Sequence, residues 1–271
     1  MNTLRTRAAL ILSLLTLAPA NVWAAEEKAK PTSEEIKKLV NDLGSANKDD
    51  VSRAKKRLAA IGPAALAAVR QAVAREGQAP AKGAQGVVEQ IARQEQKKLE
   101  DQLARRKNKN AIVYPVADQS VGQTFPSHVI LAVRFPLYPV AIRPRAPLHS
   151  QNLFIVDKDG QQEQVTDFKG MEDFFRANTG TVINASKARQ VVRAWLAMSQ
   201  ELSQDGYFTF EKTVQAGPSK FGLKATGKAT VKPEMGNKGS IEVTITFDID
   251  GMLGEIKEDK KQFRTGKRPK G

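Results

Sequence analysis

The sequence predicts an α+β protein of two domains, a small all-α stack of helices followed by an α+β domain with an antiparallel sheet. Apolar residues recur at the helical spacing of three and four positions from residue 32 to about residue 103. From residue 111 onward they recur at every second position, which is the spacing of strands with one buried face. The change of period falls at "ARRKNKN", residues 104–110, a charged segment that we interpret as a basic linker.

The helical part, residues 32–103, is predicted to hold short helices that turn back on one another. Within "RLAAIGPAALAAVRQAV" one apolar run ends at Ile61, and the next begins directly after Gly62 and Pro63. Glycine readily takes the positive φ that closes a helix, and proline suits the first helical turn because its missing N–H costs nothing there. We therefore expect a corner between two packed helices, with Leu66 in the packed face and Ala67 facing outward.

This segment resembles the HEAT-like helical repeats related to those of phycobilin lyases. The resemblance covers residues 33–94 and rests on "LVNDLGSANKDDVSRAKKRLAAIGPAALAAVRQAV" followed by "AKGAQGVVEQI". Similar runs occur in exported proteins of planctomycete-type bacteria. The resemblance implies a stack of two repeat units that serves as a docking surface for another protein. Two units are fewer than the three or more that a free-standing solenoid needs, so the stack is expected to lean on the next domain or on a partner.

The second domain, residues 111–259, begins with short strands. "HVILAVRF", "YPVAI" and "NLFIVD" have strand character, and several prolines lie beside and between them. Because proline cannot donate to a strand ladder, these prolines favour edge strands over a central position in a sheet. Met171, Phe174 and Phe175 then indicate a short helix.

A longer helix follows, capped by Asn184 or Ser186, and leads into the clearest strands of the chain. In "SIEVTITFDID" apolar and polar residues alternate, so five apolar side chains are expected to face the core: Ile241, Val243, Ile245, Phe247 and Ile249. "YFTFEKTV", "LKATGKATV" and a strand near residues 253–256 accompany it. A long helix before antiparallel strands resembles the plan of cystatin-like folds and, more distantly, of PepSY modules.

The first 24 residues have the layout of a secretory signal peptide. Arg5 and Arg7 precede the apolar run "AALILSLLTLAPA", and Val22 and Ala24 offer small residues at the expected cleavage site. The run is shorter than the roughly 20 residues that cross a bilayer. We therefore expect an exported protein, periplasmic or extracellular after cleavage, with no transmembrane segment in the mature chain. The alternative is a retained N-terminal anchor.

Residues with catalytic potential are few. The two histidines, His128 and His149, lie in proline-rich sequence without a recognisable catalytic or metal-binding motif, so polar contacts in strand and loop are the simpler interpretation. The chain has no cysteine, which excludes disulfides, thiolate metal sites and cysteine nucleophiles. "DKDG" (157–160) and "DIDG" (248–251) lack the further ligands of a calcium loop and are predicted to form hairpin turns.

One acidic cluster lies next to aromatic residues: Asp167, Glu172 and Asp173. A glycosidase-type hydrolase would need two opposed carboxylates in a cleft, and Asp167 or Glu172 would be the candidates. Acidic residues at a helix N-terminus, where they offset the helix dipole, are the simpler interpretation.

The strong excess of positive charge, +14 in total, favours contact with anionic surfaces. Basic residues gather around the linker and in the tail, residues 260–271. The candidate polyanion-binding residues are Lys97, Lys98, Arg105, Arg106, Lys107, Lys109, Lys260, Lys261, Arg264, Lys267, Arg268 and Lys270. The alternative is that both segments are simply solvated and aid solubility.

These patterns together predict an exported, non-enzymatic scaffold or protein-docking module at the cell envelope. Its expected partner is another protein bound by the HEAT-like stack, and no cofactor is expected. The first alternative is an envelope protein that binds an acidic glycan, an anionic lipid or nucleic acid through its basic segments, such polymers being attracted by clustered cations. A hydrolase is the least favoured alternative. The oligomeric state is left open.

Overall fold

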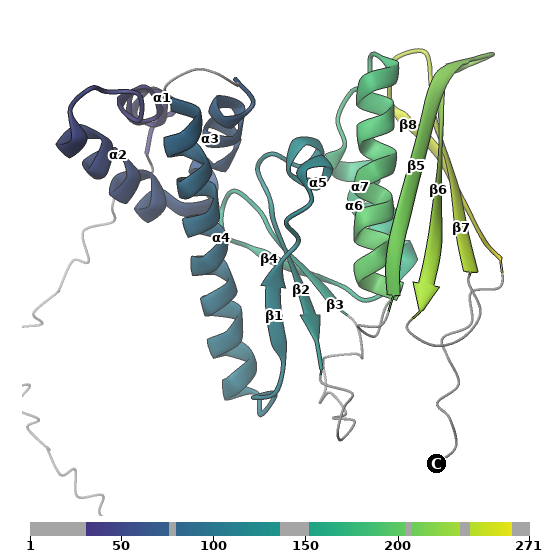
Figure 1. Ribbon diagram of the computed structural model, residues 1–271, viewed down its shortest axis with the longest axis horizontal. Helices are drawn as coiled ribbons and strands as arrows, with labels where there is room; N and C mark the ends of the chain where they lie inside the picture. Colours follow the sequence, from purple (N-terminus) through teal and green to yellow (C-terminus); the bar gives the residue numbers. More distant parts are fainter. Residues whose placement is uncertain (1–30, 76–79, 136–151, 204–207, 234–238, 262–271) are drawn as a thin grey trace, which may run out of the picture. The chain divides into compact units, whose positions relative to one another are not determined.

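The computed structural model describes residues 31–75, 80–135, 152–203, 208–233 and 239–261 (Figure 1). It confirms an α+β protein in which helices come first and antiparallel sheets follow. Residues 32–271 group as one compact unit. The described residues form two sheets of four strands each, and the strands of each sheet follow one another in the order of the sequence.

The N-terminal helices are α1 (Ser33–Asp42), α2 (Lys48–Ile61), the 3₁₀ helix η1 (Gly62–Ala65), α3 (Leu66–Val73) and α4 (Pro80–Arg105). The corner at Gly62 is confirmed: its φ is +74° and its ψ is −142°, a conformation that glycine alone takes easily. Leu66 is fully buried and Ala67 is exposed, as expected. Thr32 and Asn47 cap α1 and α2 by accepting backbone N–H groups of the first turns.

Sheet A consists of β1 (Ile112–Pro115), β2 (Val129–Arg134), β3 (Asn152–Val156) and β4 (Gln162–Val165), with α5 (Gln119–Thr124) between β1 and β2. The expectation of edge strands is wrong for β2 and β3, which occupy the two central positions. Their prolines lie outside the strands, so both strands keep their ladder donors. The segment "YPVAI" lies outside the described residues.

The central strands of sheet A are buried on both faces. On β2, Ile130 and Ala132 belong to one apolar core, while Val129, Leu131 and Val133 belong to another. The second of these cores continues into α1–α4, so the helical stack leans on sheet A, as its small number of repeats led us to expect. Sheet A therefore contributes side chains to both apolar cores, one on each of its faces.

The segment 104–110, where we expected a linker, is ordered by hydrogen bonds. Residues 104 and 105 belong to α4, and the backbone N–H groups of Lys107 and Asn108 donate to the carbonyls of Ala104 and Leu103. Asn108 is buried, with 4% of its surface exposed, and β1 begins four residues later. The segment is thus a tight corner between α4 and the first strand of sheet A.

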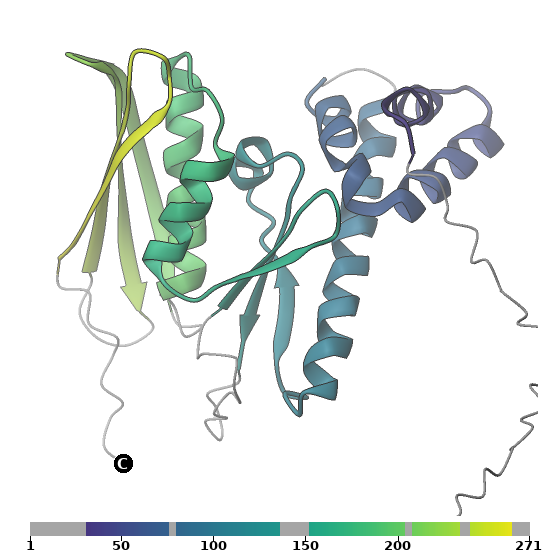
Figure 2. The same ribbon diagram turned by 180° about the vertical axis from the view of Figure 1, so that it is seen from behind.

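The remaining elements are α6 (Phe168–Asn178), α7 (Ala185–Ser203) and sheet B, formed by β5 (Phe208–Ser219), β6 (Gly222–Pro233), β7 (Gly239–Phe247) and β8 (Leu253–Lys261). Asn184 caps α7 by accepting the N–H of Lys187, one of the two expected caps. Figure 2 shows α7 lying along sheet B, and the core includes apolar residues of α5, sheet A, α7 and sheet B. Gly227 of β6 makes this close approach possible, because a Cβ there would lie 2.4 Å from Val192 Cγ1.

The two sheets repeat one order of elements: a long helix, then four antiparallel strands in sequence. Both predicted hairpin turns are confirmed, and each precedes the last strand of its sheet. In each turn the N–H of the glycine, Gly160 or Gly251, donates to the carbonyl of the first aspartate. The prediction that Ile249 faces the core is wrong. Its side chain is 89% exposed, because β7 ends at Phe247 and the alternation of buried and exposed side chains ends with the strand.

Candidate functional site

The predicted basic residues near the linker divide into two groups. Lys97 and Lys98 lie on α4 and form ion pairs within the helix, Lys97 with Asp101 at 2.9 Å and Lys98 with Glu95 at 2.7 Å. The hydrogen bond to Asp101 raises the pKa of Lys97. These two cations are therefore partly neutralised.

Four other cations form what we call the basic corner, Arg105, Arg106, Lys107 and Lys109, all exposed. Lys107 has a φ of +63°, and the backbone bonds of the corner are those of a Schellman motif that ends α4. Among the residues that the structure describes, no ion pair involves Arg106, Lys107 or Lys109. Cations at a helix C-terminus also offset the helix dipole, so the corner has a structural role as well.

The candidate cations of the tail lie at or beyond the end of the described residues. Lys260 and Lys261 end β8 and their side chains are not described, while Arg264, Lys267, Arg268 and Lys270 lie outside the described residues. The candidate polyanion site therefore reduces to the basic corner in the part of the chain that the structure describes.

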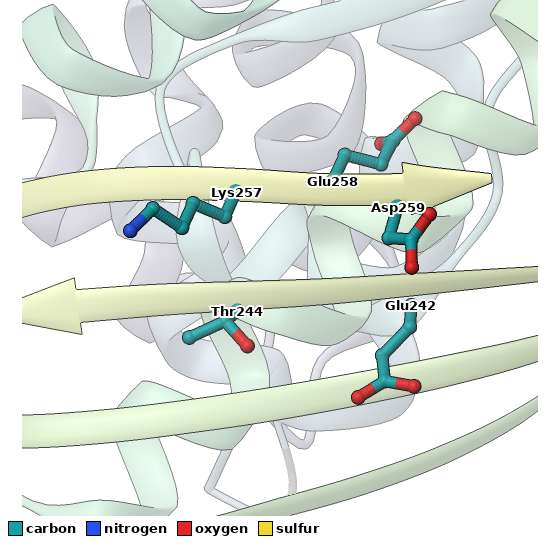
Figure 3. Close-up of a pocket in the computed structure, with 5 residues that line it drawn as sticks. All are labelled: Glu242, Thr244, Lys257, Glu258 and Asp259. Atoms are coloured by element: carbon teal, nitrogen blue, oxygen red, sulfur yellow. The ribbon is translucent and has the colours of Figure 1, made fainter.

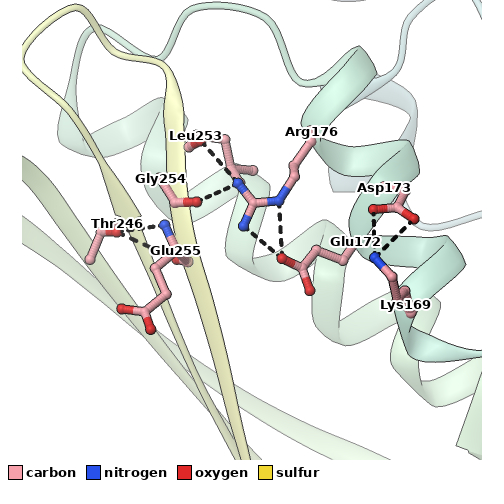
Figure 4. A network of polar contacts seen from close by, with 8 residues as sticks. All are labelled: Lys169, Glu172, Asp173, Arg176, Thr246, Leu253, Gly254 and Glu255. Carbon is pink, nitrogen blue, oxygen red and sulfur yellow. Dashed lines mark hydrogen bonds and ion pairs between the residues drawn. The ribbon is translucent and has the colours of Figure 1, made fainter.

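The three acidic residues that we considered for hydrolysis all form contacts within α6 or at its start, and Figure 4 shows those of Glu172 and Asp173. Asp167 is the N-cap and accepts the N–H of Gly170 over 2.7 Å. Because α6 begins at Phe168, Glu172 and Asp173 lie beyond its first turn, and the helix N-terminal interpretation fails for both.

Glu172 and Asp173 are instead paired within the helix. Glu172 pairs with Arg176 at 2.6 Å and Asp173 pairs with Lys169 at 3.3 Å. Arg176 also donates to the carbonyls of Leu253 and Gly254, which joins α6 to β8. This network anchors the first residues of β8, and the neighbouring Thr246 accepts the N–H of Glu255 over 2.9 Å.

One hollow of the described surface lies over β7 and β8 (Figure 3). It has a volume of about 510 Å³ and is lined by Glu242, Thr244, Lys257, Glu258 and Asp259. A smaller one, of about 320 Å³, lies between α6, α7 and β8. Within the described part of the chain no three acidic or histidine side chains are arranged to hold a metal ion.

A half-buried polar cluster joins β1, β2 and α7. The hydroxyl of Tyr114 donates to Glu201 Oε2 over 2.6 Å, and Arg134 pairs with the same oxygen. The Arg134 guanidinium lies 5.1 Å from the centre of the Tyr114 ring. Burial, followed by the hydrogen bond to Glu201, raises the pKa of Tyr114. These contacts tie α7 to sheet A, although Nε of Arg134 is buried without a hydrogen-bond partner among the described residues.

Arg70 and His128 form a second polar contact, which the sequence did not reveal. Nη1 of Arg70 on α3 donates to the carbonyls of Phe125, Pro126 and His128 over 2.9, 3.0 and 2.8 Å. Burial lowers the pKa of Arg70 to about 10. The His128 ring packs edge-on against Phe174, with centroids 5.4 Å apart, and lies 3.2 Å from Ser127 Oγ through Nδ1. His149 lies outside the described residues.

Comparison with family models, with curated proteins and with solved structures gives no match. The HEAT-like, cystatin-like and PepSY-like resemblances therefore stay predictions. Over the described ranges, no helix combines the length and the apolar character that crossing a membrane requires.

Proposed function

We propose that the protein is an exported, non-enzymatic docking protein, and that its helical stack α1–α3 holds another protein at the cell envelope. The observation that supports this proposal is the bracing of the stack. Ala54 and Leu58 of α2 and Leu66 and Val69 of α3 are buried in a core that extends into sheet A. A stack of two repeat units is too short to be stable alone, and packing against sheet A supplies the missing buried contacts.

Each helix of the stack also has positions that are open to a partner. Exposed residues include Lys37 of α1, Lys56 of α2 and Ala67 of α3. None of these three forms an ion pair among the described residues. A partner that covers Lys37 or Lys56 breaks no existing ion pair, and it must supply the counter-charge for any lysine that it buries.

The test is retention of an envelope protein by immobilised residues 25–271 and by two variants. The stack variant carries Lys56→Glu and Ala67→Arg, which change the charge and the shape of its exposed surface. The control variant carries Thr213→Arg, the same kind of change at an exposed position of sheet B. We expect the parent and the control to keep the same protein in moderate salt and the stack variant to lose it. Equal retention by all three proteins, or by none, contradicts the proposal.

The basic corner supports a second candidate function, the binding of an anionic envelope polymer. Four exposed cations lie within five residues on a hydrogen-bonded turn. Neutralising several anionic groups makes affinity strongly dependent on salt. Arg106→Gln with Lys109→Gln should therefore elute from a sulfated-polysaccharide column at clearly lower salt than the parent, while the stack variant elutes at nearly the parent position. Unchanged elution of the corner variant contradicts this candidate.

A further inference from the structure

Three loops meet at one end of sheet B: the α6–α7 loop, the β5–β6 turn and the β7–β8 turn. The N–H of Val182 donates to the carbonyl of Gly251 over 2.8 Å, which joins the first loop to the third. A Cβ on Gly222 would lie 2.3 Å from the carbonyl oxygen of Phe247, so the second loop touches the third as well. Figures 1 and 2 both show the β5–β6 and β7–β8 turns at the end of sheet B where α7 begins.

These loops carry most of the exposed large apolar side chains. Within the described residues five such side chains are exposed, and four lie on the three loops. We call these four the apolar tip: Ile183 (78% exposed), Phe221 (74%), Ile249 (89%) and Met252 (52%). The fifth, Ile112, begins β1 and is 52% exposed. Single exposed apolar residues need no explanation, but four gathered on adjoining loops indicate an interaction site.

Cations stand beside the apolar tip. Lys220 Nζ lies 5.2 Å from the centre of the Phe221 ring. Lys187 reaches the carbonyl of Thr181 in the α6–α7 loop, and Lys224 is exposed two residues after the β5–β6 turn. Three acids lie nearby: Asp248 accepts the N–H of Met252 over 2.8 Å, Asp250 is exposed, and Glu255 pairs with Lys257 at 3.1 Å. The local balance is positive, and the chain as a whole carries +14.

We propose that the apolar tip docks the protein on the surface of an anionic lipid bilayer. The four apolar side chains are distributed over three loops, with Ile249 and Met252 both on the β7–β8 turn and polar residues between them, so the tip is a set of projections and not a continuous flat patch. A protein partner of standard size buries about 800 Å² per side and needs a matching surface. A fluid bilayer interface needs no matching holes, and lysines beside inserted apolar groups lie at the level of the lipid phosphates.

This proposal goes beyond the docking function of α1–α3, because it involves other residues and another partner. It also differs from polyanion binding by the basic corner, since it requires apolar insertion as well as charge. The variants described for the stack and the corner therefore serve as controls.

The experiment is sedimentation of residues 25–271 with vesicles of phosphatidylglycerol and phosphatidylethanolamine, and with vesicles of phosphatidylcholine alone. We expect binding to the anionic vesicles and weak binding to the neutral ones. Phe221→Ser and Ile249→Ser should each weaken binding roughly tenfold, which is the scale of one buried apolar side chain. Ile112→Ser removes an exposed apolar residue elsewhere and should leave binding unchanged.

The chain has no cysteine, so a single introduced cysteine can be labelled without any other thiol reacting. A dye at that position then reports whether the side chain enters the bilayer. Ile249→Cys and Ile112→Cys, each labelled with a polarity-sensitive dye, should differ: only the label at 249 shifts to the blue on anionic vesicles. Absence of binding by the parent overturns the proposal. It is also overturned if the corner variant loses binding while both tip variants keep it. A concentration-dependent dimer in solution that Ile249→Ser dissolves, with no blue shift on vesicles, would assign the tip to a second copy of the chain instead.

Discussion

The indole Nε1 of Trp195 donates a hydrogen bond to Oε2 of Glu258 over 2.8 Å, and this bond ties the middle of α7 to the outer strand of sheet B. Ser199 Oγ approaches the same oxygen at 3.4 Å. Trp195 is 2% exposed, and its ring packs against Phe175 with centroids 5.0 Å apart. A charge that points inward from an edge strand also hinders that strand from pairing with another chain.

Trp195→Phe should lower the free energy of unfolding by roughly 1–3 kcal/mol, because a half-buried carboxylate loses its indole donor. Ser199→Ala should cost less, since a 3.4 Å contact is at the weak end of hydrogen bonding. Urea denaturation measures both changes. Adding Glu258→Met to Trp195→Phe should recover part of the loss, because no acceptor is then left at that position. Equal losses in the two single variants would contradict this assignment.

Lys107→Gly should raise the free energy of unfolding by about 0.5–1 kcal/mol, because glycine takes a positive φ with less strain than lysine. Lys107 is the single non-glycine residue with positive φ among the described residues. Lys109→Gly removes the same charge two positions away and should not stabilise. Thermal or urea unfolding of the two variants separates backbone strain from charge, and stabilisation by both would show that charge is the cause.

Arg70→Met should lower the free energy of unfolding by roughly 2–4 kcal/mol. Three backbone carbonyls between α5 and β2 lose their donor, and bonds from a charged donor are among the stronger ones. Arg75 follows α3 and is exposed, so Arg75→Met is the matched control and should change little. A small effect of Arg70→Met would mean that water replaces the guanidinium at these carbonyls.

The local features of the fold were predictable because their causes lie within a few residues. The Gly62–Pro63 corner, the two Asp-x-Asp-Gly turns and the cap at Asn184 all follow from backbone preferences of the residues concerned. The alternation in "SIEVTITFDID" located β7 for the same reason. It failed only at Ile249, where a turn that the sequence also predicted interrupts the strand.

The non-local features were not predictable. Nothing in "HVILAVRF" indicates that β2 has an apolar core on each side, because that depends on which helices cover sheet A. The contact of Arg70 with carbonyls more than fifty residues away has no local signal either. The candidate sites show the same division: the basic corner is one run of sequence, whereas the apolar tip is assembled from three loops.

The corner at Gly62 and Pro63 gives an ordered set of variants. Gly62 has a φ of +74°, and a Cβ there would meet nothing within 4 Å, so any cost arises from backbone strain alone. Gly62→Val should lower the free energy of unfolding by roughly 1–2 kcal/mol. Leu66→Ala should cost more, about 2–4 kcal/mol, because Leu66 is fully buried and its loss leaves a cavity. Ala67→Ser, at an exposed position, should be nearly neutral. Urea unfolding that finds Gly62→Val more stable than the parent would remove the corner and the stacked arrangement that depends on it.

The stability of the folded protein should depend on pH through His128. Burial lowers the pKa of His128 below its ordinary value of 6.5; Asp157 acts in the opposite direction, and Arg70 adds to the lowering. The folded protein therefore takes up this proton less readily than the unfolded chain does. The stability linked to His128 is fully present above the unfolded pKa of 6.5 and decreases as the pH falls from 6.5 toward the lower folded value.

His128→Gln cannot take up the proton, so its free energy of unfolding should fall less than that of the parent between about pH 7.5 and about pH 5. The carboxylates and His149 are common to both proteins and cancel in this difference. Urea unfolding at the two pH values is the measurement, and an identical pH dependence in parent and variant would show that the His128 ring titrates alike in the folded and unfolded states.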